Sequence, residues 1–169
     1  MTREEILQRL KEIGIIYCKP AGFLTRSSDI YYDIKKAYGY PDILNALAEL
    51  IGNKLREEEN CIAVSGYGGL PLGSVIAAKY NRRLVMLRKG EKKLGPAGPR
   101  GLFDGYPMTE VDLSVIVDDV LATGQTMELF VNSFKKIKAS ISRAIFVVEI
   151  EKIDFPIPHE SIFSTKELA

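Results

Sequence analysis

Two adjacent acids near the middle of the chain, Asp118 and Asp119, stand between an apolar run and a turn of small residues, in the stretch VIVDDVLATGQTM. Ionised carboxylates accept hydrogen bonds, and a sugar with neighbouring hydroxyl groups supplies matching donors. Neighbouring side chains of a strand point to opposite faces, so both acids reach one ligand only if the strand does not continue through them. We therefore predict a bend at the acids.

The turn after the acids has the composition of a phosphate site. Ala122 and Gly124 leave room for the backbone to approach a ligand, while Thr123 and Thr126 offer hydroxyl groups. Apolar spacing after Gln125 predicts a helix, whose N-terminus presents amide N–H groups and partial positive charge to an anion. The pattern favours a phosphorylated sugar; the alternative is a solvated strand end where the acids cap the turn.

A glycine-rich stretch, SGYGGLPLG, lies between a predicted strand and a predicted helix. Pro71 stands where a dinucleotide fingerprint needs its third glycine, and there is no Gly-Lys-Ser/Thr, so neither that fingerprint nor a P-loop is present. Glycines still permit unusual backbone angles and close contact with an anion. We predict an anion-binding loop, with a plain turn as the alternative; its residues are Ser65, Gly66, Tyr67, Gly68 and Gly69.

A basic segment, RKGEKKLGPAGPRG, opens a stretch rich in glycine and proline that shows no periodicity over 88–107. A connection this long in a compact domain is either functional or disordered. Arg88, Lys89 and Lys92 could neutralise an anion by charge-assisted hydrogen bonds if the loop closes over it. We expect Lys93 and Arg100 to face solvent.

The elements that position these residues alternate between short apolar strands and helices. Thr2 and Glu5 predict a capping box at the start of an opening helix, and a second helix follows Pro41. Between them, IYYDI predicts a short strand or hairpin. Further along the chain we predict strands over 61–65, 83–87, 113–117 and 143–150 and helices over 71–80 and 126–138.

This alternation predicts an α/β fold with an open, mainly parallel twisted sheet flanked by helices, in one domain of residues 1–169. Ligands of such sheets bind beyond the carboxyl ends of the strands, where the two acids are expected.

Composition narrows the class of protein. The chain has 169 residues, is 46% hydrophobic and has a formal net charge of +1, so no global field attracts nucleic acid or an anionic membrane. The opening residues lack the apolar core of a signal peptide, and no apolar run reaches the ~20 residues of a membrane span. Cys18 and Cys61 are far apart in the sequence, and no zinc-like cluster occurs. We expect a cytoplasmic protein.

The stretch VIVDDVLATGQTM resembles the 5-phosphoribosyl 1-diphosphate (PRPP) motif of type I phosphoribosyltransferases. The resemblance implies that Asp118 and Asp119 hold the ribose hydroxyls and that 122–126 hold the 5′-phosphate. It also assigns 65–69 to the pyrophosphate group. The individual phosphate-binding residues are then Ala122, Thr123, Gly124, Gln125 and Thr126.

Other segments resemble orotate phosphoribosyltransferases in particular. RKGEKKLG is similar to their catalytic lid, which implies a flexible loop over 88–107 with Arg88, Lys89 and Lys92 on the pyrophosphate and Lys92 as a catalytic residue. Residues 1–40 resemble their N-terminal hood, with Arg26, Tyr31 and Tyr32 towards the base.

The sequence also departs from the orotate pattern. Leu94 replaces the histidine of the lid, Ala122 stands where a threonine is frequent, and VVEIEKI lacks the expected arginine. Without that arginine a carboxylate-bearing base has fewer partners. DVLATGQTM and RKGEKKLGP are similar to adenine phosphoribosyltransferases, although the Ala-Arg-Gly-Phe segment of that family is replaced by GYGGLP.

The expected reaction is transfer of the phosphoribosyl group from PRPP to a nucleobase, orotate before adenine, with Asp118, Asp119 and Lys92 as catalytic residues. The cofactor implied is Mg²⁺, held mainly by substrate oxygens rather than by a protein cage. The resemblance also implies a homodimer. A catalytically weak PRPP-binding regulator of the same fold is the alternative from another class.

Overall fold

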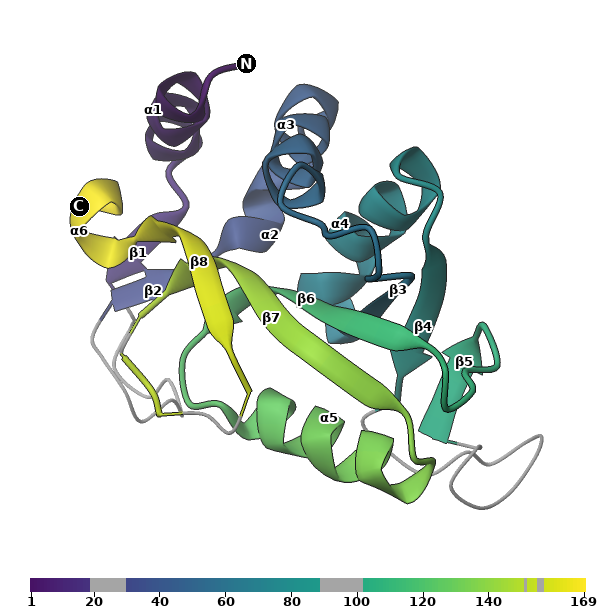
Figure 1. Cartoon of the computed structure of the whole chain (residues 1–169). Helices are drawn as coiled ribbons and strands as arrows, with labels where there is room; N and C mark the ends of the chain where they lie inside the picture. The colour runs from purple at the N-terminus through teal and green to yellow at the C-terminus, as the bar shows by residue number, and fades with distance from the viewer. Residues whose placement is uncertain (19–29, 89–101, 151, 155–156) are drawn as a thin grey trace.

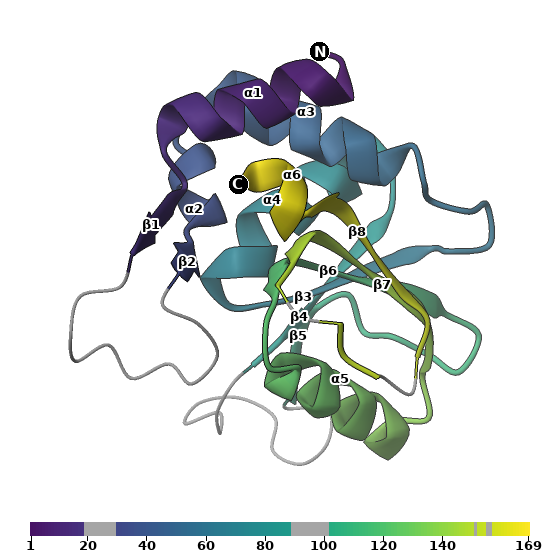
Figure 2. The same ribbon diagram turned by 90° about the vertical axis from the view of Figure 1, so that its left-hand side faces the viewer.

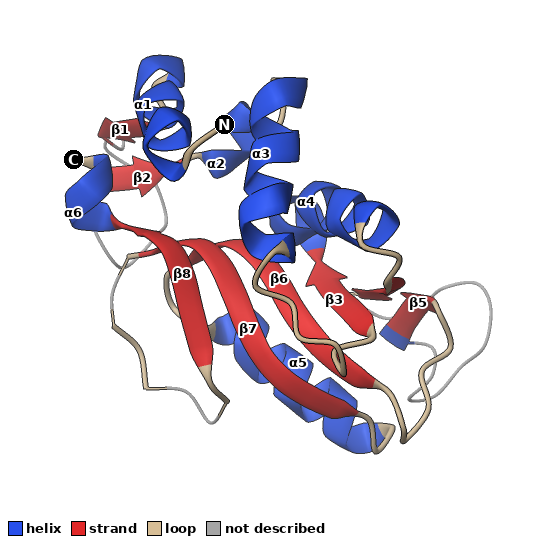
Figure 3. Ribbon diagram, turned by 45° about the horizontal axis from the view of Figure 1, so that its top comes forward, coloured by secondary structure: helices blue, strands red, loops and turns tan. Residues whose placement is uncertain are grey.

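The computed structural model describes residues 1–18, 30–88, 102–150, 152–154 and 157–169, and Figure 1 shows how they are arranged. Helices and strands alternate along most of this part of the chain, as Figure 3 shows by colour. Their bounds are α1 Arg3–Ile13, β1 Ile16–Cys18, β2 Ile30–Tyr32, α2 Ile34–Ala37, α3 Pro41–Gly52, β3 Cys61–Ser65, α4 Gly66–Lys79, β4 Arg83–Leu87, β5 Phe103–Gly105, β6 Leu113–Leu121, α5 Gln125–Lys136, β7 Ser140–Glu149, β8 His159–Ser164 and α6 Thr165–Leu168.

A single sheet of six strands forms the centre of the molecule, in the order β5-β4-β3-β6-β7-β8. All neighbouring pairs are parallel except β4 with β5. The prediction of an open, mainly parallel sheet flanked by helices is therefore confirmed. Two of its strands, β5 and β8, were not predicted, because neither has the long apolar run of the central strands.

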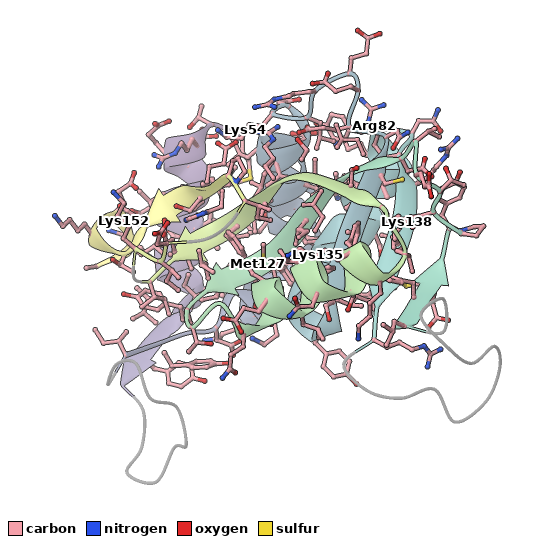
Figure 4. All side chains as sticks on the ribbon, turned by 60° about the horizontal axis from the view of Figure 1, so that its bottom comes forward. Lys54, Arg82, Met127, Lys135, Lys138 and Lys152 are labelled. Atoms are coloured by element: carbon pink, nitrogen blue, oxygen red, sulfur yellow. The ribbon has the colours of Figure 1, made fainter. Side chains whose placement is uncertain are left out.

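The central strands are buried on both faces, which explains their almost continuous apolar sequences. Ile62 and Val64 of β3 belong to the core under α1–α4, whereas Cys61 and Ala63 face the core under α5. In Figure 2 these two layers lie above and below the sheet. Met127, labelled in Figure 4 near the beginning of α5, is buried in the core under α5.

The N-terminal segment forms a small cap at one end of the sheet. Its opening helix begins with the predicted capping box between Thr2 and Glu5. The expected hairpin is the antiparallel pair β1–β2, in which Tyr17 is opposite Tyr31. The short helix α2 follows directly, and Figure 2 shows β1, β2 and α2 together at the end of the sheet that faces the viewer.

Two predicted boundaries were wrong. β6 continues through both acids to Leu121, so the expected bend at Asp118 and Asp119 is absent. Helix α4 begins at Gly66, so the predicted glycine-rich loop is the first turn of a helix. Gly66 has a φ of +63°, and this left-handed conformation turns the chain from β3 into α4 within one residue, without a loop.

The segment predicted as a loop over 88–107 contains β5 near its end. Phe103 pairs with Leu87 and Gly105 with Val85. The hairpin-like pairing of β4 and β5 therefore brings the two ends of the intervening segment together. Among the described residues, no helix has both the length and the apolar character needed to cross a membrane.

Candidate active site

The two acids lie at the carboxyl end of β6, and each residue is only 8% exposed. The Asp118 carboxylate accepts a hydrogen bond from the Asp119 N–H at 3.0 Å, and the Asp119 carboxylate accepts one from the Val120 N–H at 2.9 Å. Each side chain therefore folds back along the strand instead of projecting straight from its face. The two carboxylates therefore approach the same segment although the strand does not bend.

Both carboxylates approach the first turn of α4. A Cβ atom built on Gly68 would lie 2.2 Å from Oδ1 of Asp119 and 2.7 Å from Oδ1 of Asp118. Real Cβ atoms do not come so close to oxygen, so only glycine allows this approach. The fold thus joins two segments that the sequence places about fifty residues apart, the glycine-rich stretch and the paired acids.

The N-terminus of α4 is well suited to an anion. It follows β3 directly and presents the amide N–H groups of its first turn at the carboxyl end of that strand. The Ser65 hydroxyl is not available there, because it donates to the Leu87 carbonyl at 3.0 Å. The Tyr67 side chain is 86% exposed. Any contact of Ser65–Gly69 with an anion would therefore come mainly from the backbone.

A second helix N-terminus follows the acids. Residues 122–124 form a turn, Gly124 takes a φ of +76°, and α5 begins at Gln125. Gly124 is buried, whereas Thr123 and Gln125 are exposed. The first-turn amide N–H groups of a helix that begins in this way generally suit a small anion.

The cap contributes a cation that the sequence analysis did not single out. Lys35 of α2 has its Nζ 3.3 Å from Oδ2 of Asp119, 3.3 Å from the Tyr31 hydroxyl and 3.4 Å from Oδ1 of Asp33. Burial alone would lower the pKa of Lys35, but Asp119, Tyr31 and Asp33 together raise it above its ordinary value. Lys35 therefore stays charged.

Of the two tyrosines predicted to face a base, the structure brings only Tyr31 to this cluster. Tyr32 is 7% exposed and belongs to the core under α1–α4, where burial raises its pKa. The two side chains part because neighbouring residues of β2 point in opposite directions. Tyr31 instead contacts the Tyr17 ring, with a centroid separation of 5.1 Å.

Tyr38, at the end of α2, is a second residue that the sequence did not reveal. Its hydroxyl donates to the Gly68 carbonyl at 2.9 Å. Burial, together with the charges of Asp119 and Asp118, raises the pKa of Tyr38 well above its ordinary value. Tyr38 thus stays a neutral donor and fixes the first turn of α4 to the cap. Only the tertiary structure could identify it, because its partner lies thirty residues away.

Of the basic residues predicted to face a leaving anion, only Arg88 lies among the residues that the structure describes. Arg88 lies directly after β4, and its Nε is 2.5 Å from Oδ2 of Asp104. Lys89 and Lys92, like Arg26 of the N-terminal segment, lie outside the described residues.

The chain resembles known proteins along most of its length. It is 31% identical to an orotate phosphoribosyltransferase of Archaeoglobus fulgidus over 156 residues, covering 90% of this chain and 84% of the relative. The chain belongs to the type I phosphoribosyltransferase family. An adenine phosphoribosyltransferase of Prochlorococcus marinus is 30% identical over 146 residues, which cover 76% of this phosphoribosyltransferase and 84% of the relative.

Solved structures agree on the fold. The orotate phosphoribosyltransferase of Mycobacterium tuberculosis in complex with PRPP has a TM-score of 0.74 and 15% sequence identity, covering 99% of this chain and 91% of that one. No family model matches the chain. The phosphoribosyltransferase is therefore an enzyme with the predicted fold, and its candidate site is the cluster at the carboxyl end of β6.

The close approach of Gly68 to the acids gives the first prediction. In a Gly68→Ala variant the new methyl group must push both carboxylates away from the first turn of α4. We expect PRPP to bind more weakly by about 1–3 kcal/mol, or about 5- to 150-fold, which is the usual cost of losing hydrogen bonds to charged groups. Isothermal titration calorimetry with PRPP and magnesium measures this directly.

Gly39→Ala is the matched control, because a Cβ on Gly39 would lie 3.5 Å from the Lys36 carbonyl, an ordinary contact. We expect this variant to bind PRPP like the parent. Equal affinity of the Gly68→Ala variant would show that the acids and the first turn of α4 do not enclose the ligand together.

Proposed function

We propose that this phosphoribosyltransferase transfers the 5-phosphoribosyl group of PRPP to orotate, with release of pyrophosphate. The observation that carries the proposal is the convergence of Asp118 and Asp119 on the first turn of α4 at Gly68. Acceptors for sugar hydroxyls are thereby next to a helix N-terminus that suits an anion. The similarity to an archaeal orotate phosphoribosyltransferase supports orotate as the base.

In this proposal each segment of the site binds one part of PRPP. Asp118 and Asp119 accept hydrogen bonds from the ribose hydroxyls. The turn and helix start at 122–126 receive the 5′-phosphate. The backbone of 65–69 receives the pyrophosphate, with Tyr38 holding that turn in place through Gly68. Arg26 and Tyr31 would face the base; Tyr32, being buried, would support the same wall of the cap from behind.

The proposed step is a substitution at C1 of the ribose. A ring nitrogen of the base forms the new bond to C1, and its proton passes to solvent. The bond between C1 and the pyrophosphate oxygen breaks, and its electron pair leaves with pyrophosphate. Positive charge develops on the ribose ring on the way, so the nearby carboxylates stabilise it electrostatically.

The lid is proposed to neutralise the departing pyrophosphate. Lys92, with Arg88 and Lys89, would donate charge-assisted hydrogen bonds to its oxygens. Arg88 is paired with Asp104 in the structure and would have to exchange this partner for the leaving group.

Magnesium would accompany PRPP and balance the charge of the pyrophosphate. Within the described part of the chain, no group of three or more His, Cys, Asp or Glu side chains could hold a metal ion. A divalent ion bound mainly by substrate oxygens fits this donor set. The contribution of Asp118 and Asp119 would then be made through the ribose hydroxyls.

Adenine is the second candidate base, favoured by the similarity to an adenine phosphoribosyltransferase. The experiment is to supply PRPP and magnesium with orotate, uracil, adenine, guanine, hypoxanthine or xanthine and to measure pyrophosphate release. We expect orotate to give the fastest release. Faster release with adenine would contradict the choice of base, and silence with all six, together with tight PRPP binding, would indicate a regulator.

We further propose that the enzyme is a homodimer and that it works in the cytoplasm. In orotate-type relatives the lid serves the neighbouring site, and the similarity of RKGEKKLG to that lid supports the same assembly here. The near-neutral charge supports the location.

A further inference from the structure

Lys35 connects two parts of the site that serve different portions of the substrates. Its ammonium group lies 3.3 Å from Oδ2 of Asp119 and donates to the Tyr31 hydroxyl at 3.3 Å. It also lies 5.6 Å from the centre of the Tyr31 ring, within range of a cation–π attraction. One cation thus holds a cap tyrosine and a carboxylate of the sheet at the same time.

The contact between Lys35 and Asp119 is an ion pair in a group of three acidic side chains. Asp118 and Asp119 are adjacent, almost buried carboxylates, and Asp33 is a third acid near Lys35. Charge-assisted hydrogen bonds are about twice as strong as neutral ones, and they weaken least where water is largely excluded. The Asp119 side chain is 11% exposed and that of Lys35 is 37% exposed, so the carboxylate end of this ion pair is largely shielded from water.

The neighbouring lysine provides an internal comparison. Lys36 also lies on α2, and its Nζ donates to the Gly14 carbonyl at 3.1 Å, on the side of α1. It therefore joins two parts of the cap to one another, α2 and the residue that ends α1. Two adjacent lysines of one short helix thus make contacts of different kinds, one structural and one at the site.

We propose that Lys35 is a positioning residue that couples the base side of the site to its ribose side. This inference rests on the proposed function, in which Tyr31 faces the base and Asp119 holds a ribose hydroxyl. Lys35 orients both groups by sharing its hydrogen-bond donors between them. The base and C1 of the ribose are thereby held in register for the new bond, and small errors of position at this point are costly.

The test measures kcat and the two KM values for Lys35→Met, Lys35→Arg and Lys36→Met, with orotate and PRPP as substrates. We expect Lys35→Met to lower kcat/KM for both substrates about 10- to 100-fold, the usual effect of losing a charged hydrogen-bond partner. Lys35→Arg recovers much of this loss, because guanidinium keeps the charge and several donors. Lys36→Met has the parental values.

A double-mutant cycle separates coupling from general damage. Tyr31→Phe removes only a hydroxyl group and leaves no buried charge, so the kcat and KM values of this single variant can be measured even if Lys35→Met folds poorly, and parental values would overturn the proposal. We expect Tyr31→Phe to matter less in the Lys35→Met background than in the parent, because the two residues act through one contact. Independent, multiplicative effects would overturn the coupling.

Two other results would also overturn it. If Lys35→Met matched Lys36→Met in every constant, the ion pair with Asp119 would have only a structural role. If it raised the KM for orotate alone, Lys35 would be a direct contact of the base. A parent enzyme without transfer to any base would contradict the proposed function instead, so the two failures are distinguishable.

Discussion

Replacing either acid of β6 with its amide is expected to abolish most of the activity. Asp118→Asn and Asp119→Asn keep the size of the side chain, and the amide oxygen can still accept from the backbone N–H that follows it. The negative charge that is proposed to face the ribose is lost. We expect kcat/KM for PRPP to fall by about 10²- to 10³-fold, the range known for removing one preorganised electrostatic contact. Pyrophosphate release at limiting PRPP measures it.

Asp42→Asn is the matched control. Its side chain is 56% exposed near the start of α3, and its nearest ion-pair partner is 3.9 Å away. We expect parental kinetics for this variant and thermal midpoints close to the parent for all three. A parental kcat/KM in both Asp118→Asn and Asp119→Asn would remove the acids from the site.

The largest expected effect on stability comes from the opposite end of the strands, where Glu59 and Arg143 form a buried ion pair. Glu59 is fully buried, and its two carboxylate oxygens accept from Nε and Nη2 of Arg143 at 2.8 and 3.1 Å. Ser142 and the Arg56 N–H donate to the same carboxylate. Arg143 also pairs with Glu160 and donates to the carbonyl of Lys54, the residue labelled in Figure 4.

Breaking this pair in a Glu59→Gln variant leaves a buried guanidinium partly uncompensated. We expect a loss of about 3 kcal/mol in the free energy of unfolding, because a buried charge without its partner is costly. For a chain of this size that corresponds to a fall of about 6–12 °C in Tm. Differential scanning calorimetry at neutral pH measures it, with Glu57→Gln, an exposed neighbour, as the control.

The same pair predicts how stability depends on pH. Burial would raise the pKa of Glu59, but its hydrogen bonds from Arg143, Arg56 and Ser142 outweigh burial and lower the pKa below 4.5. A lowered pKa in the folded state means that this stabilisation is present above pH 4.5 and is lost as the pH falls through the folded value. The Glu59→Gln variant should therefore lose less stability in acid than the parent. An equal acid loss would contradict this account.

Local patterns were sufficient for the main elements. Helices α1, α3 and α5 have apolar residues at helical spacing and, in α1, a capping box, all of which depend on residues at most four positions apart. Strands β3 and β7 are almost continuously apolar because the sheet is covered on both faces. The weaker strands escaped prediction: β5 and β8 are edge strands, and edge strands bury less of their surface.

Some residues of the candidate site also have a local sequence signal, whereas others have none. Asp118, Asp119 and the turn 122–126 lie within nine residues of one another, so their proposed roles could be predicted from a local motif. Lys35 and Tyr38 had no such signal, since IKKAY on a short helix has no motif that marks a contact. Their partners, Asp119 and Gly68, lie 84 and 30 residues further along the chain.

By itself, the sequence determined the class of fold, and it predicted the phosphate-binding turn and the pair of acids, because periodicity and motif spacing are local properties of the chain. Only the tertiary structure decided that the acids curl towards Gly68, that Tyr31 rather than Tyr32 contacts Lys35, and that Lys35 ties the cap to the sheet. These are contacts between segments that are distant in the sequence. They arise because the crossover connections of a parallel sheet bring the carboxyl ends of the strands, the N-termini of the helices and the cap to the same side of the sheet.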